Sequence, residues 1–285
     1  MNVLELTVET EPKDAGIWRL YPIGDLHIDS KLTDLDRLKK YIALVAADPH
    51  GMYVIVGDFV DGTTPSHHFF EPDVIVPDIM QNMSQYVAAT MLMLERILEP
   101  LKDTPGVVIQ GNHDVRRGGT LWSGIAWEMA RRLGAEYGGD ECIIRLKAST
   151  PQKSRGNYVW LIHAFHGDGG GMYPGGKINR FQNTVGHLTD ADILIRGHVH
   201  DSDTRIVPLY SCTRKGNARM VERRRAYVTA PAFMRNRVEG VNSYASRKGY
   251  PPSDDGLIYL EVANPSINKK SARHGTSMRR IEAPF

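Results

Sequence analysis

The chain has 285 residues, of which 41% are hydrophobic and 24% charged, as in an ordinary soluble globular protein. It contains no apolar run approaching the ~20 residues needed to cross a bilayer, and residues 1–16 are mixed and acidic, unlike a secretory leader. We therefore expect no membrane segment and a cytoplasmic location. Cys142 and Cys212 are too few for a disulfide framework, which indicates two thiols in a reducing cytoplasm.

The net charge of +2 conceals an asymmetry along the chain. Residues 1–202 carry 19 Lys and Arg against 26 Asp and Glu, a balance of −7, whereas residues 203–285 carry 16 against 7, a balance of +9. This basic segment predicts either contact with a polyanion or a solvated basic surface, and the charge count does not separate the two.

Strand-like apolar runs alternate with amphipathic helices through the first two-thirds of the chain. The strands are expected at 18–23, 52–56, 107–110, 158–165 and 193–196, and the helices at 32–45, 78–101 and 121–134, with Asp29 or Ser30 as the first N-cap. Short β-like runs follow at 205–209, 226–229 and 257–262. This order predicts one α/β domain over residues 1–265, β-rich and basic from about 203, and an extended or poorly ordered basic tail over 266–285.

Five short blocks rich in metal-ligand side chains each directly follow one of these runs. They are Asp25-Leu26-His27, Gly57-Asp58-Phe59-Val60-Asp61, Gly111-Asn112-His113-Asp114, His166-Gly167 and Gly197-His198-Val199-His200. Strand ends are where α/β sheets present their sites, and residues i and i+2 of an extended segment point the same way. The mixture of carboxylate, amide and imidazole predicts two divalent cations, with Mn, Fe, Zn, Co or Ni suiting the ligands better than Ca or Mg. Such a pair predicts attack of a metal-bound hydroxide on a phosphate ester.

Other candidate residues favour simpler roles. His163 lies three residues before His166, on the opposite face of its strand, which indicates a core position or a position that supports a ligand. His67 and His68 fall in a loop that is either exposed or lines a cleft. The segment from Gly171 to Lys177 matches GxxxxGK but lacks the Ser or Thr that a P-loop requires, so it indicates a glycine-rich lid rather than an ATP site.

The blocks DLH, GDFVD, GNHD, HG and GHVH, all intact between Asp25 and His200, resemble those of the calcineurin-like metallophosphoesterases. The resemblance implies an α/β four-layer αββα sandwich with two mixed β-sheets flanked by helices. It also implies two metal sites: Asp25, His27 and His200 would hold one ion, Asn112, His166 and His198 the other, and Asp58 would bridge them. The second aspartate of GDFVD, Asp61, is expected to be structural or to support a ligand.

The resemblance further implies that His113 faces the scissile phosphate and protonates or stabilises the leaving oxygen. Asp114 would hydrogen-bond His113 and orient it, and a turn-stabilising role for this acid is compatible with that. The expected function is a dinuclear metal-dependent phosphoesterase with Mn²⁺ as the preferred ion.

Within this function, we favour a phosphodiesterase that acts on DNA or RNA. We expect Arg223, Arg224 and Arg225 to contact the substrate. Two alternatives are open. The first is a phosphatase or diesterase acting on a small nucleotide or a phosphoprotein. The second is a non-catalytic scaffold, although a scaffold has no need for the leaving-group acid His113.

Overall fold

A computed structural model describes residues 1–9, 17–63, 70–117, 124–149, 158–168, 174–185, 188–212, 217–241, 243–249, 256–263 and 276–281. His67, His68 and residues 171–173 of the segment from Gly171 to Lys177 lie outside these residues, so their predicted roles stay predictions. Among the described residues, no helix combines the length and the apolar character that crossing a bilayer requires.

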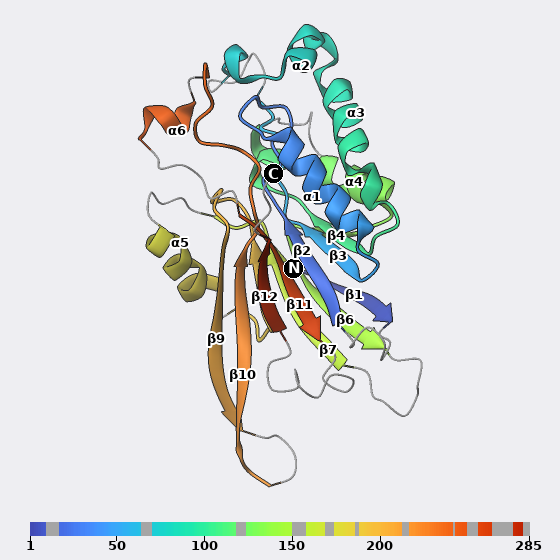
Figure 1. Ribbon diagram of the computed structural model, residues 1–285, viewed down its shortest axis with the longest axis vertical. Coiled ribbons are helices and arrows are strands. Elements are labelled where there is room, and N and C mark those ends of the chain that lie inside the picture. The colour runs from blue at the N-terminus through green and yellow to red at the C-terminus, as the bar shows by residue number, and fades with distance from the viewer. Residues whose placement is uncertain are drawn as a thin grey trace.

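The strands of the described residues form two six-stranded sheets (Figure 1). Sheet A has the order β1 (Asn2–Glu9), β6 (Glu141–Ser149), β7 (Tyr158–Phe165), β8 (Ile193–Arg196), β10 (Met220–Thr229) and β9 (Asp203–Cys212). Sheet B has the order β12 (Thr276–Ile281), β11 (Leu257–Ala263), β2 (Ile17–Ile23), β3 (Gly51–Ile55), β4 (Gly106–Ile109) and β5 (Glu136–Gly139). Each sheet combines parallel and antiparallel pairs, which confirms the prediction of two mixed sheets.

Helices cover the outer face of each sheet. The helices α1 (Leu35–Ala47), α2 (Pro77–Gln81), α3 (Tyr86–Leu98) and α4 (Ile125–Leu133) lie together on one side of the molecule (Figure 1). The helix α5 (Pro174–Arg180) and the π-helical turn η7 (Phe181–Val185) lie on the other side, where Phe181 packs with Leu194 of β8 and Tyr227 of β10. A further short helix, α6, spans Tyr244–Arg247. The layers therefore follow the predicted αββα order.

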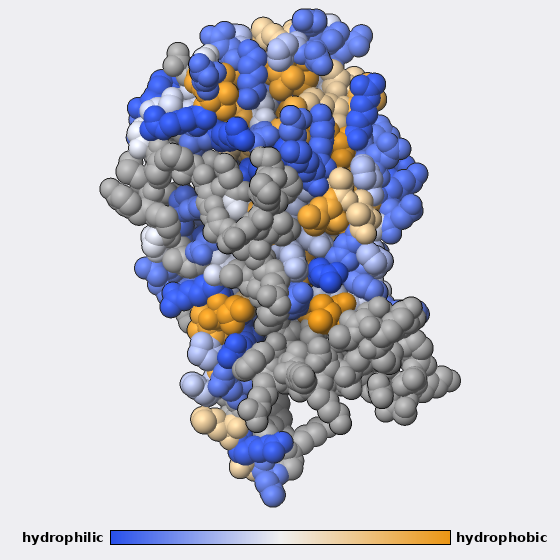
Figure 2. Space-filling model, viewed as in Figure 1, coloured by the Kyte–Doolittle hydropathy of each residue, from blue (hydrophilic) through white to orange (hydrophobic). Residues whose placement is uncertain are grey.

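The apolar pattern of the strands explains this layering. Val54 of β3 and Ile162 of β7 belong to one buried cluster between the sheets. Tyr53 and Ile55, the residues on either side of Val54 in the sequence, belong to a second cluster beneath α1–α4. Because successive side chains of a strand point to opposite faces, the wholly apolar β3 buries both of its faces. On the view in Figure 2, the exposed apolar residues form separate patches among polar ones.

The described structure corrects several predicted elements. The helix expected over 78–101 is interrupted: α2 ends at Gln81, the 3₁₀ turn η3 (Met83–Gln85) follows, and α3 runs into a second 3₁₀ turn, η4 (Glu99–Leu101). The first helix is capped by Asp34, which accepts from the backbone N–H of Arg37, and not by Asp29 or Ser30. Part of the expected tail, Thr276–Ile281, is strand β12, while the domain boundary at 265 stays a prediction.

Candidate metal centre

The predicted ligand residues lie on the loops that leave β2, β3, β4, β7 and β8. These strands belong to the two facing sheets, so the loops meet at one edge of the sandwich. Backbone bonds join them directly: His27 N–H donates to Asp58 O at 3.0 Å, and Gly197 N–H donates to His166 O at 2.9 Å. The fold therefore places five segments of the sequence in contact at this edge.

A left-handed backbone directs the ligand side chains. Among the described residues other than glycine, positive φ occurs at five positions: Asp25, His27, Asp58, His198 and His200, with φ between 40° and 70°. Such conformations are costly for residues with a Cβ and cluster where a site requires them. The expectation that extended i and i+2 residues point the same way is therefore wrong for Asp25/His27 and His198/His200, which converge because each loop turns sharply after its strand.

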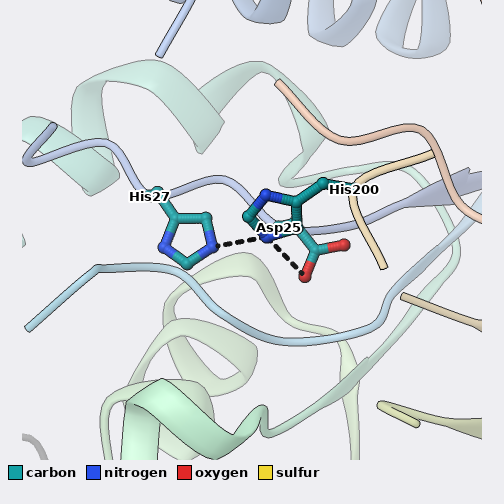
Figure 3. Close-up of side chains that lie close together, drawn as sticks. All are labelled: Asp25, His27 and His200. Carbon is teal, nitrogen blue, oxygen red and sulfur yellow. Dashed lines mark hydrogen bonds and ion pairs between the residues drawn. The ribbon is translucent and has the colours of Figure 1, made fainter. Parts of the chain in front are cut away.

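One group consists of Asp25, His27 and His200, whose candidate donor atoms lie within 4.8 Å of one another (Figure 3). The Nε2 atoms of His27 and His200 are 3.2 Å apart, and His200 Nε2 is 3.9 Å from Asp25 Oδ1. Asp25 and His27 are completely buried. Both Asp25 oxygens accept from the backbone N–H of His198, at 3.0 and 2.9 Å, which fixes the carboxylate.

The second group consists of Asn112, His166 and His198. Asn112 Oδ1 lies 2.9 Å from His166 Nε2 and 2.8 Å from His198 Nδ1, and the two ring nitrogens are 3.3 Å apart. His166 Nδ1 contacts Val56 O at 2.6 Å, and a carbonyl only accepts, so Nδ1 carries the proton. The other nitrogen of His166, Nε2, is therefore the one directed at the group, as in histidines oriented for metal binding.

Asp58 lies between the two groups. Its Oδ2 is 3.1 Å from His166 Nε2 and 3.8 Å from His27 Nε2, while Oδ1 accepts from the backbone N–H of His113 at 2.9 Å. The same oxygen thus faces both groups. Burial acts to raise the pKa of Asp58, but the hydrogen bond and charge of His166, with further contributions from His113 and His27, hold it well below its usual range.

The donor set fits divalent cations. An ion about 2.0–2.2 Å from each N or O ligand requires donors about 3–3.4 Å apart, close to the spacings within the second group. Burial and the nearby His166 lower the pKa of His198 to about 4, and burial lowers that of His200, so both rings are neutral as metal binding requires. Burial works against the protonated form of His166, yet Asp58 raises its pKa to about 9, so without a cation a proton takes the position between them.

His113 is next to this cluster and is oriented by Asp61. Its Nδ1 lies 3.1 Å from both the carbonyl oxygen and Oδ1 of Asp61, while Nε2 is 3.9 Å from Asp58 Oδ2. Both Asp61 atoms are acceptors, so Nδ1 carries a proton and the Nε2 edge is the one directed toward the cluster.

The predicted bond between Asp114 and His113 is wrong. The oxygens of Asp114 accept from three backbone amides, those of Asp58 at 3.0 Å, Phe59 at 3.0 Å and Gly111 at 2.7 Å. Asp114 thus holds two ligand loops together, which is the turn-stabilising role. The orienting role that was predicted for Asp114 belongs instead to Asp61. The signal for Asp61 in the sequence was its place as the second aspartate of GDFVD, and this residue contacts the His113 ring.

The three arginines expected at the substrate do not reach the cluster. Arg223 pairs with Asp192 at 2.7 Å, and Arg225 donates to Ala191 O and Thr189 O. The end of β10 near the cluster is Thr229, four to six residues further on, which is roughly 13–20 Å at the rise of a strand. Only Arg224, whose nearest charged contact is Glu222 at 3.6 Å, projects from the opposite face of the strand.

The structure also places His163 and Lys177. His163 is completely buried on the outer face of sheet A, where its ring contacts Phe165, which confirms the core position. Lys177 donates to Val199 O at 3.1 Å and lies 3.4 Å from Asp201 Oδ2, so it is engaged with the loop that carries His198 and His200.

Comparisons with known proteins agree with this fold. Residues 19–202, well over half of the chain, match the family model described as calcineurin-like phosphoesterase. The chain therefore belongs to the calcineurin-like phosphoesterase family. A search of curated proteins found no match.

The solved structures that are similar to this chain share little sequence identity with it. A protein described as GAP50, the anchor in the inner membrane complex of Plasmodium, is 10% identical with a TM-score of 0.50 over 93% of this chain and 84% of that one. The Pseudomonas putida nuclease MPE is 15% identical with a TM-score of 0.33 over 84% and 82%, and Chaetomium thermophilum Vps29 is 10% identical with a TM-score of 0.32 over 93% and 95%.

Proposed function

We propose that the protein is a dinuclear metal-dependent phosphodiesterase, with Mn²⁺ as the preferred ion. The observation that carries this proposal is the placement of Asp58 Oδ2 between two groups of buried donors, with His113 beside it. When bound, two divalent ions would neutralise the charge of a phosphate ester and make water nucleophilic at neutral pH. Asp25, His27 and His200 would hold one ion, and Asn112, His166 and His198 the other, with Asp58 shared.

His113 supplies the acid. Because Nδ1 donates to Asp61, the proton that the ring can release is the one on Nε2, on the edge that faces the cluster. The adjacent carboxylate of Asp61 stabilises the charged imidazolium before the transfer and fixes the ring plane. A leaving oxygen bound at the cluster would receive the Nε2 proton as its bond to phosphorus breaks.

The first experiment separates metal binding from chemistry. Purified protein loaded with Mn²⁺ is assayed on bis-p-nitrophenyl phosphate, with a chelator-treated sample as the blank. Asp58→Asn should lower the occupancy of both sites, and His113→Ala should keep both ions yet lose roughly 10²–10⁴-fold in rate. The loss should be smaller with p-nitrophenyl than with alkyl leaving groups, which need protonation more.

His50→Ala is the matched control for these variants. This histidine contacts Trp18, a residue of β2 outside the metal cluster, and its loss should leave metal content and rate unchanged. Full metal loading in Asp58→Asn would refute the shared carboxylate. Metal-loaded wild-type protein that hydrolyses no phosphate ester would instead favour the scaffold reading, in line with a structural relative that is described as an anchor.

Nucleic acid is the substrate that we propose for this site. The support is the balance of +9 over residues 203–285, which include the exposed Arg224 on β10. Arg224 is five residues from Thr229, roughly 16 Å, so a duplex, which rises about 3.4 Å per base pair, must extend about five base pairs beyond the cluster to touch both. We expect KM to fall as oligonucleotides pass this length, while kcat stays constant.

Arg224→Glu tests the contact without disturbing the bonds that Arg223 and Arg225 make. The variant should raise KM for long oligonucleotides, flatten the salt dependence of binding and leave hydrolysis of a small diester unchanged. A panel of single-stranded DNA, duplex DNA, RNA, cyclic nucleotides and phosphopeptides identifies the preferred class. Wild-type protein without salt-sensitive binding to any DNA or RNA would contradict the nucleic-acid proposal and favour a small nucleotide or phosphoprotein.

A further inference from the structure

Asp29 is a buried carboxylate that belongs to neither metal group. It is 2% exposed and accepts three hydrogen bonds: Oδ1 from the backbone N–H of Asp61 at 2.7 Å, and Oδ2 from Gly62 N–H at 3.0 Å and from the Tyr86 hydroxyl. In the part of the chain that the structure describes, no cation pairs with it. Burying a carboxylate on neutral donors alone is costly, so the arrangement requires an explanation.

Two of the three donors to Asp29, the backbone N–H groups of Asp61 and Gly62, belong to the turn that orients His113. Asp61 faces His113 Nδ1 with both its carbonyl oxygen and its Oδ1, each at 3.1 Å. Its side chain is 29% exposed, and the next residue, Gly62, has a left-handed φ of 70°. The two amide bonds to Asp29 therefore fix the backbone of a partly exposed turn whose geometry decides the position of the His113 ring.

Tyr86 connects this turn to a rigid element. It is the first residue of α3, is 6% exposed and belongs to the apolar cluster between sheet B and the helices. The backbone of Asp29 is tied to the same region, because its carbonyl accepts from Val76 N–H at 2.9 Å. The hydroxyl of Tyr86 thus locates the Asp29 carboxylate relative to the helical layer, and Asp29 in turn locates the Asp61 turn.

We propose that Asp29 and Tyr86 are positioning residues that act on His113 through Asp61, and that they hold the His113 ring in the tautomer with the proton on Nδ1. The proposal rests on the function proposed above for the rate effects that it predicts. Its geometric consequence, the tautomer and orientation of His113, is independent of any activity.

The kinetic test is a double-mutant cycle. Tyr86→Phe removes one hydroxyl and keeps the ring in the core, and it should lower kcat about 10- to 100-fold while KM and metal content stay at wild-type values. In a His113→Ala background the same substitution should have no further effect, because its target is absent. Asp29→Asn replaces a carboxylate by an amide of the same size and should give the same pattern with a larger loss.

Tyr41→Phe is the matched control. Tyr41 is also a buried tyrosine of the same cluster, and its hydroxyl bonds to the carbonyl oxygens of Pro22 and Ile258, away from Asp29. Losing that hydroxyl should lower the melting temperature without changing kcat. A rate loss that is equal in Tyr86→Phe and Tyr41→Phe, or that persists in the His113→Ala background, would overturn the positioning role and leave only a structural one.

The second readout needs no catalysis. The ring nitrogens of the 11 histidines are followed by ¹⁵N NMR in metal-free protein, and the His113→Ala spectrum identifies the signals of His113. Wild-type protein should show a single Nδ1–H form of His113, and Tyr86→Phe should show a mixture of tautomers. An unchanged His113 spectrum in both Tyr86→Phe and Asp29→Asn would refute the proposal, whereas an inactive wild type with the expected spectra would refute only the proposed function.

Discussion

Replacing Gly111 with alanine perturbs the shared carboxylate without removing any ligand. An added Cβ at this position would lie 2.2 Å from Asp58 Oδ1 and 2.3 Å from Asp58 N. Ordinary van der Waals contact begins at 3.4 Å, so the side chain and backbone of Asp58 must together retreat by about 1 Å. The backbones are closely packed here, since a Cβ added at the neighbouring Gly57, whose φ is 90°, would itself lie 2.2 Å from Gly111 N.

The size of this shift sets the expected effects. Metal sites tolerate ligand displacements of about 0.2 Å, so moving Asp58 by about 1 Å should weaken Mn²⁺ binding roughly 10- to 100-fold and lower the hydrolysis rate about 100-fold. Overpacking should cost about 1–3 kcal/mol in the free energy of unfolding of the metal-free protein. The two effects are of similar size in free energy, because a 10- to 100-fold loss of affinity corresponds to about 1.4–2.8 kcal/mol, so each is measured separately.

Titration calorimetry with Mn²⁺ and urea denaturation of the chelated protein measure these two quantities. Gly176→Ala in α5 is the matched control, because an added Cβ there meets no described atom within 4 Å. The control should bind metal normally and gain up to about 1 kcal/mol from the helix preference of alanine. If Gly111→Ala bound two Mn²⁺ ions with wild-type affinity, Asp58 would not be the residue that both sites share.

Three further outcomes follow from residues outside this loop. Lys177→Met removes the ammonium that holds Val199 O and should weaken Mn²⁺ binding about 10- to 100-fold by calorimetry; normal affinity would contradict its support of that loop. Burial raises the pKa of the Cys142 thiol to about 12, so a thiol reagent should titrate only the exposed Cys212 in native protein and both in urea. Burial lowers the pKa of His163, so the fold favours its neutral form. In chelated protein, the free energy of unfolding of the wild type should fall relative to that of His163→Phe as the pH falls below about 6.5. A difference in unfolding free energy between the two proteins that stays constant from pH 8 to pH 5 would refute this.

Periodicity predicted the strands best where both faces of a strand are buried. Tyr158–Phe165 and Ile193–Arg196 form strands with the expected bounds, since continuous apolar runs leave few other ways to be buried. The edge strands β1 and β5 and the amphipathic β6 were not predicted, because exposed edge positions carry polar side chains that resemble loops. The long helical pattern over 78–101 gave no sign of the break after Gln81, where Asn82 ends α2.

The sequence by itself identified the ligand blocks, because metal-ligand side chains directly after apolar strands are a local pattern. It also determined the αββα architecture, through the resemblance that those blocks carry. The donor spacings of about 3 Å depend instead on left-handed turns at Asp25, Asp58 and His198, which no residue-by-residue preference predicts. Such turns are stabilised by bonds between loops that lie far apart in the sequence.

The partners of the two aspartates that follow the ligands were decided only by tertiary structure. Asp114 is adjacent to His113 in the sequence, yet its oxygens accept amides from the Asp58 loop, whereas Asp61, 52 residues away, contacts the His113 ring. A carboxylate binds whichever donors the packed loops bring within about 3 Å, and neighbours in sequence often point apart. The types of residue at the site were thus readable from the chain, but their pairing followed from how the two sheets set the loops against each other.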